Sequence, residues 1–169
     1  MERTFKEIFL SKWVPALITA IVGGIVVAIV IPKYQANYAE ESALKKRKIE
    51  LWESIGDNFT NYITYRGRLN SAALSEIKLR SSNQIIPRRF LDRKESYRVE
   101  RDKYATQLRR DFLLADYYYD NQVEIIIKSF QEWHGQYKDK TVEQLPSDEE
   151  YYKWRDRIML GIRENLTKK

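Results

Sequence analysis

The sequence predicts an all-α protein, in which a single N-terminal transmembrane helix precedes a helical bundle of long helices. Three observations carry this prediction. A stretch of 20 residues contains no charge, apolar residues recur at helical spacing through the rest of the chain, and turn-forming residues are scarce, with 6 Gly and 4 Pro among 169 residues. We find no run that alternates between apolar and polar residues, which is the pattern of a half-buried strand.

Composition excludes several classes of function. The chain has no Cys and a single His, His134, so it offers no disulfide framework, no thiolate metal site and no cysteine nucleophile. It also lacks a phosphate-binding glycine loop, a paired-histidine metal motif and a nucleophile elbow. The sequence therefore predicts no metal and no other cofactor, and no small-molecule substrate is evident.

The charge-free stretch runs from Trp13 to Pro32 and reads WVPALITAIVGGIVVAIVIP. As a helix that rises about 1.5 Å per residue it would be roughly 30 Å long, which matches the hydrocarbon core of a bilayer. Trp13 and Tyr34 stand near its ends, where amphipathic rings favour the membrane interface. A buried core helix and a cleaved signal peptide are the alternatives, but no convincing small-residue cleavage site follows. We therefore expect an uncleaved transmembrane helix over 13–32.

The residues on either side of this stretch predict an interfacial segment and a membrane topology. Residues 1–12 place Phe5, Ile8 and Phe9 near one helical face, which predicts a short interfacial segment. Three basic residues precede the stretch and five follow it within 33–48. By the positive-inside rule this difference favours a single-pass topology with residues 33–169 in the cytoplasm.

Small side chains form a stripe along the same stretch. Residues four apart stack on one face of a helix, and small ones allow two helices to approach closely in lipid. The alternative is chance, because Ala and Gly are common in membrane helices. We expect self-association through this face, and conduction would need a ring of several copies because one helix encloses no channel. The packing residues are Ala16, Thr19, Ala20, Gly23, Gly24 and Ala28.

The remainder of the chain is predicted to be helical nearly throughout. Apolar residues keep helical spacing over 36–80, with Gly56 and Gly67 as the expected weak points or breaks. A connection is expected over 81–87, because the residue before Pro87 is biased away from helical geometry.

A second long stretch over 88–134 is expected to break near Asp120 and to stop at Gly135. Ser147 has the features of a helix N-cap, because Glu150 stands three residues later and completes a capping box. An apolar stripe follows and predicts the last helix. The bundle should therefore contain three long helices, or four or five where the long ones break.

Charge is unevenly distributed along this helical part. Residues 45–110 carry 17 basic and 8 acidic side chains, whereas residues 111–150 carry 3 basic and 10 acidic ones. Such asymmetry favours contact between copies or between helices of one copy, and a solvated helix face is the alternative. The predicted basic patch consists of Lys45, Lys46, Arg47, Lys48, Arg88, Arg89, Arg93, Arg109 and Arg110.

The densest basic run lies between residues 88 and 110 and has Tyr97 and Tyr104 interleaved with it. Basic groups contact phosphates and aromatic rings stack on bases, so the run could bind single-stranded RNA. Acidic residues at i,i+3 and i,i+4 spacing offer ion pairing within the helix as the alternative interpretation.

His134 has two interpretations. It shares an apolar stripe with Ile127 and Phe130, which predicts a packed histidine. The run Lys128-Ser-Phe-Gln-Glu-Trp-His134, however, resembles the short motif of HEPN domains, in which Arg or Asn precedes a His on a helix. That resemblance implies a cation that steadies phosphate charge and an imidazole that does acid–base work. Lys128 replaces the Arg and cannot reproduce its planar donor fork, which argues against nuclease activity.

The opening TFKEIFLSKWVPALIT, the single anchor and the HEPN-like run together resemble the membrane accessory proteins of type VI-B CRISPR systems. The resemblance implies a homo-oligomeric ring in the lipid bilayer of the bacterial inner membrane, forming a pore that supports antiviral defence. It also implies a scaffold rather than an enzyme, with an RNA-guided RNase or its RNA products as partners. The alternatives are a membrane-tethered HEPN ribonuclease with Lys128 and His134 at its site, and an anchored module that recruits a cytosolic partner through its basic helix.

Overall fold

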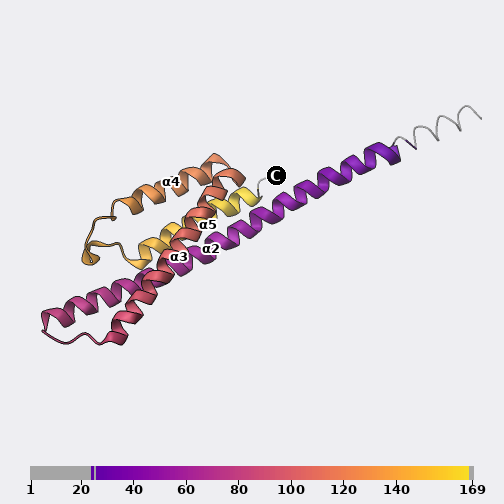
Figure 1. Ribbon diagram of the computed structural model, residues 1–169. Coiled ribbons are helices and arrows are strands. Elements are labelled where there is room, and N and C mark those ends of the chain that lie inside the picture. The colour runs from indigo at the N-terminus through magenta and orange to yellow at the C-terminus, as the bar shows by residue number, and fades with distance from the viewer. Residues whose placement is uncertain (1–23, 25, 168–169) are drawn as a thin grey trace, which may run out of the picture. The chain divides into compact units, whose positions relative to one another are not determined.

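The structure, a computed structural model, describes residue 24 and residues 26–167. The chain divides into two compact units, Met1–Lys46 and Arg47–Lys169. Every regular element in the described residues is a helix, which confirms the predicted all-α fold for this part of the chain. In order, the elements of Figure 1 are η1 Val26–Val30, α2 Ile31–Ser81, α3 Arg88–Tyr118, α4 Asn121–Gly135, η2 Val142–Gln144 and α5 Asp148–Thr167.

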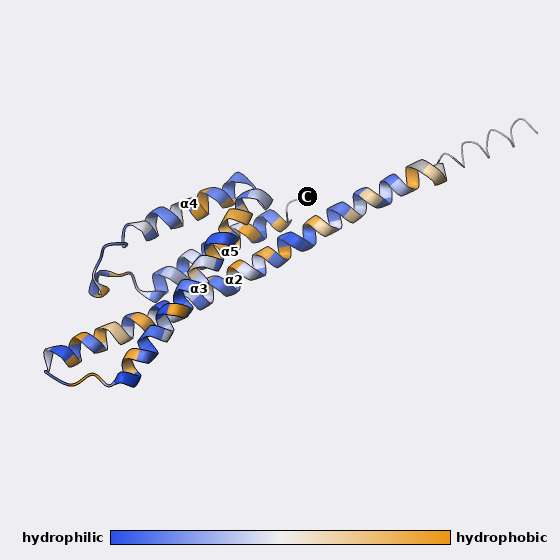
Figure 2. Cartoon of the chain, in the orientation of Figure 1, coloured by the Kyte–Doolittle hydropathy of each residue, from blue (hydrophilic) through white to orange (hydrophobic). Residues whose placement is uncertain are grey.

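In the first unit, the side chains that the structure describes are exposed and do not pack into a core. Residues 31–46 of α2 are all exposed, and so are Gly24 and Ala28 of the predicted packing stripe. Figure 2 shows hydrophobic residues at the first described turns, followed by a mostly polar run along α2. No helix within the described ranges is both long enough and apolar enough to cross a bilayer. The predictions that lie outside the described residues are the segment 1–12, most of the span 13–32, and Ala16, Thr19, Ala20 and Gly23.

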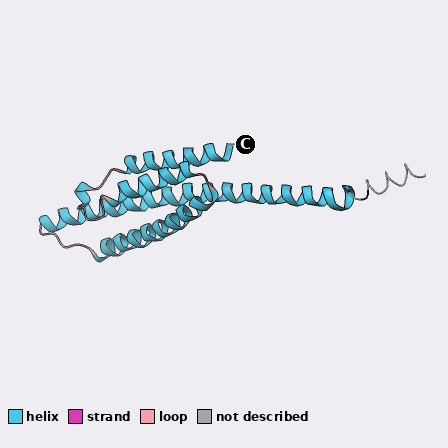
Figure 3. Ribbon diagram, turned by 90° about the horizontal axis from the view of Figure 1, so that it is seen from above, coloured by secondary structure: helices cyan, strands magenta, loops and turns pink. Residues whose placement is uncertain are grey.

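The second unit is the predicted helical bundle, in which α3, α4 and α5 pack together with the later turns of α2 (Figure 3). Phe59, Phe112 and Phe130 come from α2, α3 and α4, and their ring centroids lie 4.9 to 6.2 Å apart. From α5, Ile158 and Ile162 reach the same core and are fully buried. Removal of these large apolar groups from water is the main stabilising contribution to the bundle.

The predicted breaks at Gly56 and Gly67 are wrong, because α2 runs through both positions. Each glycine lies where a side chain of α5 comes close. A Cβ on Gly56 would lie 2.9 Å from Met159 Cε, and one on Gly67 would lie 2.2 Å from a carboxylate oxygen of Asp148. Glycine inside a helix costs about 1 kcal/mol relative to Ala, and here it leaves room for the neighbouring helix.

The other predicted boundaries are confirmed. Residues 82–87 connect α2 to α3, and the carboxylate of Asp120 caps α4 by accepting from two backbone N–H groups. Helix α4 ends at Gly135. Ahead of α5, the N–H of Glu150 donates to Ser147 Oγ at 3.3 Å, and the N–H of Ser147 donates to Glu150 Oε2 at 2.9 Å. The local signals for helix ends were therefore sufficient at these positions.

Candidate functional site

His134 lies on the last turn of α4, with its ring among aromatic side chains. Its Nδ1 lies 2.8 Å from the hydroxyl of Tyr151 on α5. Phe130, one turn earlier, stacks on the imidazole with centroids 5.8 Å apart and planes inclined by 12°. Tyr62 of α2 presents a ring edge at 6.1 Å. The residue nevertheless remains exposed on its open side, so the histidine is packed but accessible.

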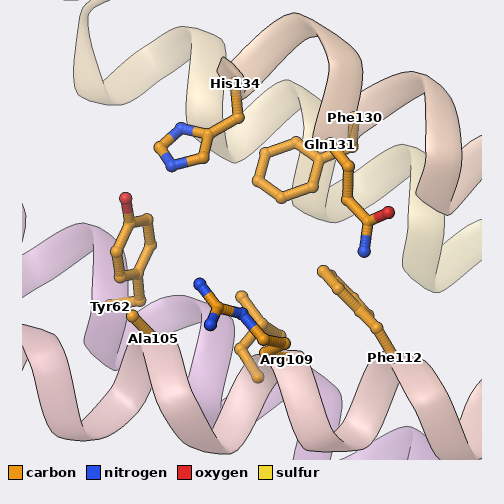
Figure 4. A pocket seen from close by; sticks show the side chains of 8 residues that line it. Tyr62, Ala105, Arg109, Phe112, Phe130, Gln131 and His134 are labelled. Carbon is orange, nitrogen blue, oxygen red and sulfur yellow. The ribbon is translucent and has the colours of Figure 1, made fainter. Parts of the chain in front are cut away.

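The open side of His134 faces a pocket of about 270 Å³, which we call the His134 pocket. Figure 4 shows its lining side chains, which come from α2, α3 and α4. The hydroxyl of Tyr62, the guanidinium of Arg109 and one ring nitrogen of His134 point toward the same space. Gln131 adds an amide group, while Phe112 and Phe130 supply apolar walls. The pocket therefore combines several polar groups with an aromatic lining, as small-ligand sites commonly do.

A buried cation lies behind this pocket. Arg66 of α2 is only 4% exposed, so its charge has to be satisfied within the protein. It donates from Nη1 to Asp148 Oδ1 at 2.8 Å and from Nη2 to the carbonyl oxygen of Pro146 at 2.6 Å. Its guanidinium carbon also lies 4.0 Å from the ring centroid of Tyr151. These contacts fix Tyr151, and through Tyr151 they orient His134.

Burial and this buried charge set the protonation states of the pocket. Burial lowers the pKa of His134 below its ordinary value of 6.5, and the positive charge of Arg66 lowers that pKa further. The imidazole is therefore neutral at pH 7. Burial raises the pKa of both Tyr151 and Tyr62 above the ordinary value of 10, so both hydroxyls stay protonated.

This arrangement can bind an oxyanion and exchange a proton. The Nδ1–H of the neutral imidazole can donate to the hydroxyl oxygen of Tyr151, which leaves Nε2 as the proton acceptor of the ring. Arg109 would hold the negative charge, and it makes no ion pair within the described ranges. A neutral imidazole beside an available guanidinium is a combination suited to phosphate chemistry.

The structure does not bring the two HEPN-like residues together. Lys128 forms an ion pair with Glu124 on the exposed side of α4, and its side chain is 61% exposed. That contact raises the pKa of Lys128. Lys128 does not line the His134 pocket, and the cation found there is Arg109 from the predicted basic patch. Lys128 and His134 therefore do not line one pocket, because their separation of six helical residues places them on different faces of α4.

The rest of the basic run divides into paired and available cations. Arg98 and Lys103 pair with Glu95 and Glu100 at the i,i+3 spacing that the sequence predicted. Lys94 instead pairs with Glu76 of α2, and Arg101 pairs with the adjacent Asp102. The remaining cations of residues 88–110 form no ion pair in the part of the chain that the structure describes, and they are Arg88, Arg89, Arg93, Arg109 and Arg110.

Sequence reasoning missed Tyr62, Arg66, Gln131 and Tyr151 as site residues. One signal was present, because Arg66 follows Tyr62 at helical spacing and so falls on the apolar stripe of its helix. A charged residue on such a stripe indicates a buried cation with a partner elsewhere in the fold. No comparable signal marks Gln131.

The described residues hold no cluster of three or more His, Asp or Glu side chains that could bind a metal ion. No protein-family model, curated protein or solved structure matches the chain. Its function therefore has to be argued from its own residues.

Proposed function

We propose that this chain is a single-pass membrane protein whose copies assemble through their N-terminal helices into a pore. The charge-free stretch from Trp13 to Pro32 carries the proposal, because it has the length that the hydrocarbon core of a bilayer requires. The surplus of basic residues after the stretch favours a cytoplasmic location for residues 33–169. In this proposal the bundle is a scaffold.

Exposed apolar side chains at the end of the stretch and just after it support this proposal. Ile31, Tyr34 and Tyr38 follow each other at spacings of three and four residues, so they share one face of α2. Tyr34 and Tyr38 are 78% and 74% exposed. An exposed row of large apolar groups is typical of a surface that contacts lipid or another protein, and tyrosine rings favour the membrane interface.

Self-association rests on the stripe of small residues. Among the described residues, nothing lies within 4 Å of a Cβ added to Gly24. This position is therefore open to a second copy, and small residues allow close helix contact in lipid. The resemblance to type VI-B accessory proteins would place such a ring in the bacterial inner membrane, where it would act in antiviral defence.

A pair of matched substitutions tests the pore. The full chain is expressed in bacteria, and a membrane-potential dye is followed with and without the Gly24→Leu change. We expect the wild type to depolarise the membrane and Gly24→Leu to abolish this effect. Gly135→Leu is the control, because a Cβ there also meets nothing within 4 Å. Equal depolarisation by wild type and Gly24→Leu would contradict assembly through this face.

RNA cleavage is a second candidate, and it is favoured by Arg109 and His134, which face one pocket. Nε2 of His134 would take the proton of an attacking 2′-hydroxyl as its oxygen bonds to phosphorus. As the bond from phosphorus to the 5′-oxygen breaks, the imidazolium would give that proton to the leaving 5′-oxygen, while Arg109 would stabilise the charge on the phosphate. Purified full-length protein is incubated with single-stranded RNA. His134→Ala and Arg109→Ala should each abolish cleavage, whereas Lys128→Ala should retain it. Cleavage that persists in His134→Ala would remove this candidate.

A further inference from the structure

A second, separate groove is formed by α2, α3 and α5, and we call it the Arg93 groove. It shares no lining residue with the His134 pocket. It encloses about 580 Å³, which falls within the range of roughly 300 to 1,000 Å³ that ligand sites span. Three cations line it, Arg68, Arg93 and Lys94, against the single carboxylate of Asp148. Its lining therefore favours an anion.

Two of these cations are available to a ligand. Lys94 Nζ is held 2.6 Å from the carboxylate of Glu76, and Asp148 is already paired with the buried Arg66. Arg93 is exposed and makes neither an ion pair nor a hydrogen bond in the described stretch. Arg68 is also exposed, and within the described residues it interacts with aromatic rings and forms no ion pair. Two guanidinium groups, one from α2 and one from α3, thus line the same groove without a carboxylate partner.

Aromatic rings hold Arg68 in place. Its guanidinium carbon lies 5.3 Å from the ring centroid of Tyr65 and 5.9 Å from that of Tyr97. Tyr65 in turn stacks on Tyr104 with centroids 5.7 Å apart and planes inclined by 12°. The two tyrosines that interrupt the basic run in the sequence therefore both lie beside residues of α2, Tyr97 beside Arg68 and Tyr104 beside Tyr65. Within the groove itself, Tyr97 and Tyr152 are half-buried and offer ring surfaces.

We propose that the Arg93 groove binds the phosphate ester of a nucleoside, either as a free nucleotide or within single-stranded RNA. The donor forks of Arg68 and Arg93 fit phosphate oxygens, which accept two parallel hydrogen bonds from a guanidinium. The rings of Tyr97 and Tyr152 are the stacking surfaces for the base. Ser71 adds a hydroxyl on the wall for the ribose. This inference goes beyond the proposed pore and does not depend on membrane insertion.

The test is a binding measurement on the full chain in mild detergent. The probes are adenosine monophosphate, a short single-stranded oligouridylate and inorganic phosphate, so that the source of the phosphate is distinguished. Arg93→Ala should weaken binding of the nucleotide or the RNA roughly tenfold or more, because a charge-assisted hydrogen bond is lost. Arg89→Ala is the matched control, since Arg89 lies on the same helix, is exposed, forms no described ion pair and does not line the groove.

A second variant separates stacking from charge. Tyr152→Leu should weaken binding of the nucleotide and the RNA, and leave the affinity for inorganic phosphate unchanged, because the cation beside the Tyr152 ring is Arg155, which does not line the groove. Equal losses in Arg93→Ala and Arg89→Ala would overturn the inference, because they would indicate a diffuse positive surface. An absence of binding by all three probes would also overturn it. A change in oligomer mass in Arg93→Ala, without a change in nucleotide affinity, would instead identify the groove as a contact between copies and overturn it.

Discussion

Residues 31–46 and residues 51–66 belong to the same helix, α2, but they have different surroundings. Residues 31–46 are exposed at every position, although Ile31, Tyr34 and Tyr38 are large and apolar. The later stretch buries six side chains along one stripe, and they are Leu51, Ile55, Phe59, Tyr62, Ile63 and Arg66. Both stretches show apolar spacing that is typical of a helix with a packed face. The comparison teaches that apolar spacing alone does not say whether a helix face is buried within its own chain.

The largest expected effect is the loss of a buried ring from the later stretch. Phe59 is fully buried among Phe112 and Phe130, so Phe59→Ala should lower the free energy of unfolding by about 3 to 5 kcal/mol. Tyr38→Ala removes a ring that is 74% exposed, and we expect it to leave this free energy nearly unchanged. Denaturant unfolding of the full chain in mild detergent measures both. A comparable loss in Tyr38→Ala would mean that the early stretch also packs within one chain.

The second-largest loss of stability is expected when the buried cation, Arg66, is removed. Arg66→Ala leaves the carbonyl of Pro146 and the carboxylate of Asp148 without their donor, which should cost about 1.5 to 3 kcal/mol of unfolding free energy. Arg98→Ala breaks an exposed pair with Glu95 and should leave the midpoint of unfolding close to that of the wild type. Equal midpoints for the two variants would show that Arg66 is not the buried partner described above.

A smaller effect is expected where α5 approaches Gly67. A Cβ at this position would lie 2.2 Å from a carboxylate oxygen of Asp148, so Gly67→Ala should displace that carboxylate from Arg66. The expected loss is about 1 to 2 kcal/mol, which is within the usual cost of overpacking. Gly135→Ala is the control, because its Cβ meets no described atom within 4 Å. Thermal unfolding of both variants decides the point, and a Gly67→Ala protein as stable as Gly135→Ala would contradict the close approach.

The smallest effect is a pH dependence that comes from His134. Because the pKa of His134 is lowered in the folded protein, the unfolded chain takes up the proton first as pH falls below the ordinary value of 6.5. Folded stability should therefore be complete above that value and decrease as pH falls through the lowered pKa. We expect a larger drop in melting temperature between about pH 7.5 and about pH 5.5 for the wild type than for His134→Gln. Identical drops would show that His134 does not contribute.

Most helix ends and buried faces of the bundle could be predicted from the sequence, because the residues that determine them lie close together along the chain. The caps at Asp120 and Ser147 involve residues only two or three positions away, and the stripe through Ile55 and Phe59 repeats within one helix. The continuity of α2 through Gly67 could not be predicted in the same way. The group that occupies the space beside Gly67 is the carboxylate of Asp148, which lies on α5 and is distant from Gly67 in the sequence.

The candidate site was predicted only in part for the same reason. His134 stood out as the single histidine, and Arg109 was included in the basic patch. Their meeting depends on how α3 and α4 pack, and no spacing in the sequence encodes it. Lys128 was chosen because it is near His134 in sequence, but helical geometry points it to another face, where Glu124 is its partner.

Fractionation of cells that express the full-length chain tests most directly whether the early stretch finds its partner outside its own chain. Membranes are washed at high pH and then extracted with a mild detergent, and the mass of the extracted particle is measured. We expect the protein to remain in the washed membranes and to emerge as an assembly of several copies of the 20.3 kDa chain. Protein found in the aqueous fraction without detergent would contradict membrane insertion, and an extracted monomer would contradict self-association.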